Sequence, residues 1–249
     1  MDKFFKYEKE RWEVPRLEYA ILDADNSNFV DEYTLTYAQQ SAMDPKGDEL
    51  DAFVAEMSAV LQANNGLDVY KKNFFRGKLV LFDFRSHLYA PLICLEKSNL
   101  KIQLAPVALN TDEMRFVDYL KSYVDDHAAE LAGKSLYLLR NKSKVGMGFF
   151  EAGNFYPDYI LWIDTPATQY ISFIDPKGLM HIRPDDPKIE FHKTIKDLET
   201  RLSPTADGKR IVLNSFIMAG TRSSDLRMWW STPEVDADRA YREARNVYT

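Results

Sequence analysis

The sequence predicts an α/β protein, because segments with the apolar spacing of a helix alternate with short apolar runs of strand length. The chain has 249 residues, of which 45% are hydrophobic and 13% aromatic, so it can fill a sizeable core. No apolar run approaches the roughly 20 residues that a membrane-spanning helix needs. We therefore expect a folded chain without a membrane segment.

Residues 1–105 predict a mixed α/β extension. Residues 48–63 carry apolar side chains at helical spacing, and an Asn-Asn-Gly sequence ends this helix. Three short apolar segments further on, divided by polar residues, predict an antiparallel meander. The strands expected here are residues 18–25 and 32–40, followed by the meander of residues 78–84, 87–96 and 100–106.

Residues 106–249 predict a second domain with the order helix, three strands, helix and strand. Asn110 is a suitable N-cap, and Glu113 completes a capping box at the start of a helix that runs to about His127. The elements expected after this helix are strands at residues 135–139, 159–163 and 170–174, a helix at residues 189–202, a strand at residues 210–218 and a polar helix from Glu234.

The strands at residues 159–163 and 170–174 are apolar at nearly every position, which predicts that both of their faces are covered. The six polar residues between them suit a hairpin centred on Pro166 and Ala167. This register pairs position 159 with 174 and places Asp158 opposite Asp175, with Cβ atoms about 5 Å apart. Because strand side chains alternate, Lys177 returns to the same face.

Two neighbouring carboxylates repel each other, and a bound divalent cation removes that penalty. Mg²⁺ prefers oxygen ligands, often takes one or two carboxylates and keeps water in its shell. A lysine beside it can orient or deprotonate a water molecule, or stabilise charge on a phosphate. Glu113 heads the apolar stripe of its helix, so it either joins the pair or only closes its capping box.

The net charge of −6 argues against a free-standing nucleic-acid binder of high affinity, because such affinity comes mainly from Lys and Arg. Residues 71–78 and 134–148 are nevertheless rich in cations and free of acids. Each stretch is either a solvated surface or a nucleic-acid contact. The single cysteine, Cys94, excludes an internal disulfide and fits a reducing compartment, so we expect a cytoplasmic protein.

Glu113, Pro157-Asp158 and Asp175-Pro176-Lys177, in this order of elements, resemble the PD-(D/E)XK nuclease superfamily. Residues 104–180 also resemble the C-terminal endonuclease region of type III restriction enzyme Res subunits and related helicase-nuclease defence proteins. The resemblance implies a restriction-endonuclease-like core, α-β-β-β-α-β, with a central mixed sheet flanked by helices. It further implies hydrolysis of DNA phosphodiester bonds that depends on Mg²⁺, with Mn²⁺ as the other candidate, in antiviral defence.

The resemblance also assigns roles to single residues. Asp158, Asp175 and the backbone carbonyl of Pro176 are the implied metal ligands, and Lys177 positions or activates the attacking water. Glu113 is the implied helix acid, with Glu151 as the alternative. The candidate nucleic-acid contacts are Arg140, Lys144, His192 and Lys196 in the second domain, and Lys71, Lys72 and Arg76 in the first.

The chain departs from the resembled proteins because it has no phosphate-binding loop of an ATPase motor. Gly77-Lys78 and Gly208-Lys209 both lack the upstream glycine and the following Ser or Thr. We therefore expect double-stranded DNA as substrate and a helicase, translocase or modification subunit supplied by another chain or by a missing N-terminal region. The alternatives are a catalytically inactive nuclease-like module for DNA binding or docking, and a nuclease that cuts RNA.

Overall fold

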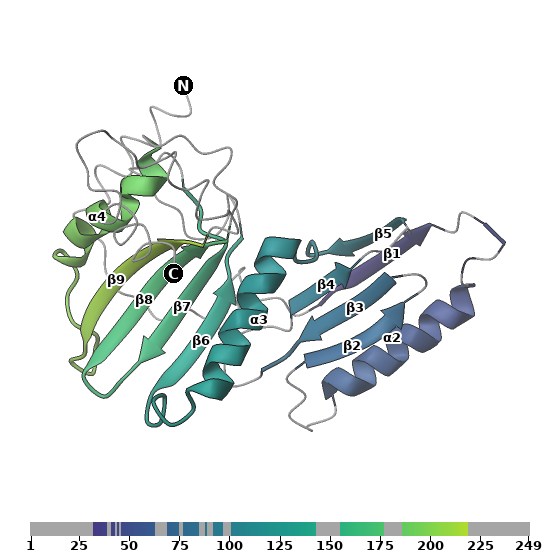
Figure 1. Cartoon of the computed structure of the whole chain (residues 1–249), viewed down its shortest axis with the longest axis horizontal. Coiled ribbons are helices and arrows are strands. Elements are labelled where there is room, and N and C mark those ends of the chain that lie inside the picture. Colours follow the sequence, from purple (N-terminus) through teal and green to yellow (C-terminus); the bar gives the residue numbers. More distant parts are fainter. Residues whose placement is uncertain are drawn as a thin grey trace. The chain divides into compact units, whose positions relative to one another are not determined.

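The computed structural model is α/β and contains three helices, a mixed sheet and antiparallel sheets within the described part of the chain (Figure 1). The chain divides into two compact units between Asp126 and His127, and each unit is described by itself. This division follows compactness alone, so the domain boundary at residue 105 stays a prediction. The structure describes residues 32–38, 41, 42, 44, 46–62, 69–74, 77–84, 88, 92–96, 101–142, 155–176 and 186–218.

The predicted strand at residues 18–25 and the predicted helix from Glu234 lie outside these residues. None of the described helices is long and apolar enough to cross a membrane.

The first unit contains a three-stranded antiparallel sheet, a two-stranded sheet and two helices. Its elements are β1 (Thr34–Ala38), α2 (Gly47–Gln62), β2 (Val69–Phe74), β3 (Gly77–Phe82), β4 (Leu92–Glu96), β5 (Lys101–Ala105) and α3 (Thr111–Asp126). Phe53 of α2 packs on Leu79, Leu81 and Ile93 of the larger sheet. This cluster of buried side chains is the local core of the unit.

The predicted meander is correct for two of its three strands and wrong for the third. The sheet order is β2-β3-β4, whereas β5 pairs with β1. The third strand of the larger sheet is instead the basic strand β2, which pairs with β3. Only two residues separate β2 from β3, so closing the loop of this hairpin costs little conformational entropy. Its side chains alternate, with Tyr70 packed on the core and Lys71 exposed.

The second unit is built on a four-stranded mixed sheet with the order β6-β7-β8-β9. β6 to β8 form an antiparallel meander, and β9 runs parallel to β8 after the crossover helix α4. The order of three strands, helix and strand that the sequence predicts is confirmed. The bounds are β6 (Ser135–Arg140), β7 (Tyr159–Asp164), β8 (Thr168–Asp175), α4 (Pro187–Glu199) and β9 (Arg210–Ile217).

Helix α4 begins two residues earlier than predicted because Asp186 caps it. The Asp186 side chain accepts a hydrogen bond from the Lys188 N–H at 2.9 Å, and Pro187 occupies the first turn, where its missing N–H costs nothing. Phe191 on this helix is fully buried and meets the ring of Phe155 edge-on at 5.7 Å between centroids. The helix covers one face of the sheet, on which Ile160, Ile171, Phe173, Ile211 and Leu213 lie.

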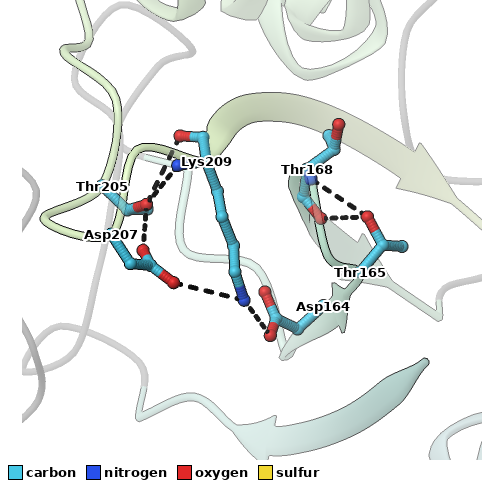
Figure 2. A network of polar contacts seen from close by, with 6 residues as sticks. All are labelled: Asp164, Thr165, Thr168, Thr205, Asp207 and Lys209. Atoms are coloured by element: carbon cyan, nitrogen blue, oxygen red, sulfur yellow. Dashed lines mark hydrogen bonds and ion pairs between the residues drawn. The ribbon is translucent and has the colours of Figure 1, made fainter. Parts of the chain in front are cut away.

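The turn end of the β7 and β8 hairpin is tied to the loop before β9 by a polar network (Figure 2). Lys209 Nζ lies 2.5 Å from Asp164 Oδ2 and 3.4 Å from Asp207 Oδ2. The Thr205 hydroxyl donates to Asp207 Oδ1 and accepts from the Lys209 N–H at 2.9 Å. Gly208 has a φ of +81°, a conformation that glycine adopts without strain and that lets the loop close.

Replacing Lys209 with Ala should lower the melting temperature by several degrees, because the partly buried Asp164 carboxylate then loses its cation. Lys193→Ala is the matched control: its partner Glu190 is solvent-exposed, and such pairs contribute little. Thermal unfolding followed by circular dichroism measures both variants. Equal melting temperatures for the two variants contradict a stabilising role for this network.

Candidate metal centre

The register of β7 and β8 is the predicted one. Tyr159 pairs with Ile174 and Ile163 pairs with Tyr170. One step beyond Tyr159 and Ile174, the same register places Asp158 opposite Asp175. By strand alternation both aspartates belong to the face that carries Ile160 and Phe173, which is the face that α4 covers.

Asp175 is the last residue of β8, and its exposed fraction is 0%. The neighbouring strand β9 holds it: it aligns with Ile217, and its backbone carbonyl accepts a hydrogen bond from the Met218 N–H at 3.0 Å. Pro176 follows it and is also buried, whereas Asp158 is half-buried. Burying a carboxylate is costly unless hydrogen bonds or a cation compensate it. An ionised Asp175 therefore needs hydrogen-bond donors or a positive charge close to its side chain.

Asn141 is a residue of this site that the sequence analysis missed. Its exposed fraction is 7%, and it directly follows β6. Its N–H donates to the Asp158 carbonyl at 2.8 Å, and its Nδ2 donates to the Pro157 carbonyl at 2.9 Å. No sequence pattern marks this residue; it is found from the structural register, because extending the β6 and β7 pairing by one residue puts Asn141 opposite Asp158.

The donor chemistry at this end of the sheet fits Mg²⁺ or Mn²⁺. Asp158 and Asp175 supply carboxylate oxygens, and Pro176 supplies a backbone carbonyl oxygen, all hard ligands of the kind that these ions prefer. No group of three or more His, Cys, Asp or Glu side chains suited to a metal occurs among the residues that the structure describes. Lys177 and Glu151 lie outside them, so their predicted roles stay predictions.

Glu113 forms the capping box that the sequence predicts. Its Oε2 accepts from the Asn110 N–H at 2.8 Å, and its own N–H donates to Asn110 Oδ1 at 3.0 Å. The side chain is buried and belongs to the first unit, near Cys94. Burial, followed by Glu96 and Glu113, raises the pKa of the Cys94 thiol to about 11, so the thiol stays protonated at neutral pH. The metal-ligand role of Glu113 stays a prediction.

The described cations that are predicted to bind nucleic acid belong to both units. Lys72 forms an ion pair with Glu56 and lies over the Phe53 ring, whereas Lys71 is exposed. Arg140 aligns with Tyr159 and therefore faces the side of the sheet opposite to Asp158. Arg76 and Lys144 lie outside the described residues.

Lys196 and Glu199 of α4 bind the outer edge of β9. Lys196 Nζ donates to the Leu213 carbonyl and to Asn214 Oδ1, and the Leu213 N–H donates to Glu199 Oε2 at 2.8 Å. The two side chains also pair with each other at 2.9 Å. They cover backbone groups of an edge strand that otherwise invite pairing with another chain. His192 is half-buried, with Nδ1 2.7 Å from the Ile189 carbonyl.

Lys188 is a second residue that the sequence analysis missed. Its ammonium lies 5.5 Å from the centroid of the Phe155 ring, within the usual distance of a cation–π contact. Phe155 precedes Asp158 by three residues, and α4 starts after the end of β8 that carries Asp175. Lys188 therefore lies against a residue of the core between α4 and the sheet, and that residue belongs to the segment that leads to Asp158.

Comparison of the chain with protein-family models, with curated proteins and with solved structures finds no match.

Glu199→Gln should change how stability depends on pH. Burial opposes the ionised form of Glu199, but hydrogen bonds from Lys196 and the Leu213 N–H outweigh it, so the pKa of the carboxyl lies below its ordinary value of 4.5. Its contribution is therefore complete above about pH 4.5 and is lost as the pH falls through the lowered pKa.

At about pH 7 the variant should be less stable than the wild type by about 1 kcal/mol, the usual net value of a hydrogen bond. Urea unfolding at several pH values down to about pH 3 should show this difference shrinking. A difference that stays constant over this range contradicts the role of the charged carboxylate.

Proposed function

We propose that the chain carries a metal-dependent endodeoxyribonuclease built on a restriction-endonuclease-like core. The observation that carries the proposal is the register of β7 and β8, which pairs Tyr159 with Ile174; extended by one residue, it would set Asp158 opposite Asp175 on one face at one end of the sheet. Two acids in this relation repel each other in the absence of a cation. Hydrolysis of a phosphodiester assisted by Mg²⁺ or Mn²⁺ is the reaction class that uses such a pair.

The architecture of the second unit supports the same proposal. A three-stranded antiparallel meander, a crossover helix and a parallel fourth strand form its mixed sheet. Helix α3, which belongs to the first unit, precedes these elements in sequence, so the order along the chain is α-β-β-β-α-β. The sequence resemblance to PD-(D/E)XK nucleases rests on this order and on the residues at the strand ends.

The residues would share the chemistry as follows. Asp158, Asp175 and the Pro176 carbonyl would hold the cation, which supplies charge stabilisation at the phosphate and lowers the pKa of bound water. The sequence-based role of Lys177 is to orient the water and to stabilise charge on the phosphate. Burial of Asp175 and Pro176 at the end of β8 keeps these ligands in place.

A partner with a motor fits the charge of the chain. The net charge of −6 disfavours tight binding of DNA, and Lys72 and Lys196 are already paired within the protein. We propose that a helicase or translocase brings double-stranded DNA to the site. RNA is the alternative substrate, and parallel assays with single-stranded DNA, double-stranded DNA and RNA separate the two.

Asp175→Asn and Asp158→Asn should each lower Mg²⁺-dependent cleavage of plasmid DNA by at least about a hundredfold, because losing a ligand removes charge stabilisation worth several kcal/mol. Lys177→Ala should have the same effect on the basis of its sequence-predicted role. Asp197→Asn, an exposed aspartate on α4, is the matched control. Cleavage by Asp175→Asn at the wild-type rate contradicts the proposal.

The inactive docking module is distinguished by thermal unfolding with and without metal. A real site at about 100 times its Kd stabilises the fold by about 2.7 kcal/mol, and Asp175→Asn should abolish this gain. Without metal, Asp158→Asn should melt at or above the wild-type temperature, because it removes a repelling charge. Absence of any shift with Mg²⁺ or Mn²⁺ in the wild type favours the docking module.

Lys188 is the α4 lysine best suited to contact a DNA phosphate. The other two lysines of the helix after it, Lys193 and Lys196, are paired with Glu190 and Glu199. The structure gives Lys188 a contact with the Phe155 ring and no ion pair among the described residues. The ring holds the ammonium in place without neutralising its charge, which leaves that charge able to attract an anion.

Lys188→Ala should therefore weaken DNA binding and reduce the slope of log K against log salt by about 1, the loss of one phosphate contact. Fluorescence anisotropy with a labelled duplex in EDTA measures this without cleavage. Lys193→Ala removes the same charge from the same helix and should keep the wild-type slope. Identical slopes for both variants contradict a phosphate contact by Lys188.

A further inference from the structure

Asn141 holds the peptide that carries Asp158 with two hydrogen bonds. Its backbone N–H reaches the Asp158 carbonyl at 2.8 Å and its side-chain amide reaches the Pro157 carbonyl at 2.9 Å. The second bond fixes the orientation of the side chain, because a carbonyl accepts only from the amide nitrogen. The side chain is buried, so both bonds form away from competing water.

The bond from the Asn141 amide satisfies a buried backbone acceptor beside Asp158. Pro157 is buried, so its carbonyl needs a hydrogen-bond donor from within the protein. The Asn141 side chain, which directly follows β6, supplies that donor. As a result, the residue that follows β6 fixes the peptide that leads into β7, although β6 itself brings no acid to the site.

We propose that Asn141 is a positioning residue for the metal-binding carboxylate of Asp158. The inference rests on the proposed function, since it assumes that Asp158 binds a divalent cation. Partners that orient a ligand commonly change metal affinity by about 10- to 100-fold when they are removed. Asn141 acts through the backbone of Pro157 and Asp158 and does not itself contact the metal in this proposal.

The test measures metal affinity and unfolding separately. Asn141→Ala should raise the Kd for Mn²⁺ at least about tenfold, measured by calorimetry and by the metal-induced shift in melting temperature. Asn141→Ser keeps a donor of shorter reach and fills part of the space, so it should fall between Ala and wild type and folds more readily. Thr205→Ala is the control: Thr205 is also buried and hydrogen-bonded, but it lies at the turn end of the sheet.

A loss of metal affinity in the Asn141 variants but not in Thr205→Ala supports the inference, even where all three melt at a lower temperature without metal. Wild-type Mn²⁺ affinity in folded Asn141→Ala or Asn141→Ser overturns the inference and leaves the proposed metal site intact. Absence of Mn²⁺ binding by the wild type overturns the proposed metal site and this inference with it.

Discussion

The register of β7 against β8 is the constraint on which the rest of the second unit depends. A slip of one residue would move Ile160 and Phe173 away from α4 and turn the charged ends of the strands to the other face. The loop that sets the register is closed by Thr165, whose N–H donates to the Thr168 carbonyl at 2.9 Å and whose hydroxyl accepts from the Thr168 N–H at 3.0 Å. A short polar turn thus determines both the core and the candidate site.

The two ends of the sheet have different electrostatic character because the register treats them differently. At the turn end, Asp164 faces Lys209 from the loop before β9, and opposite charges meet. At the other end, the same register extended by one residue beyond β7 would set two like charges, Asp158 and Asp175, at opposite positions. The ion pair with Lys209 balances the charge of Asp164 at the turn end. At the other end, the proposed cation would balance the two aspartates.

Local pattern predicted the second unit better than the first. The strands, the crossover helix and the pairing of position 159 with 174 followed from apolar runs and one turn, all of them close in sequence. The pairing of β5 with β1 could not be predicted in this way, since it joins segments more than sixty residues apart and no turn connects them. Asn141 was missed because a single polar residue after a strand has no pattern of its own.

The basic residues show that composition does not determine which charges are free to bind a ligand and which are paired within the protein. A stretch rich in Lys and Arg predicts a positive surface only if the fold places no acids beside it, and such acids come either from another element or from the next turn of the same helix. Lys72 meets Glu56 of α2, and Lys196 meets Glu199 and the edge of β9, so both charges act within the protein. Among the described residues, fewer cations are available for phosphates than the sequence suggests, and the net charge of the chain is −6. This shortage is the strongest argument for the proposal that a partner protein brings DNA to the candidate site.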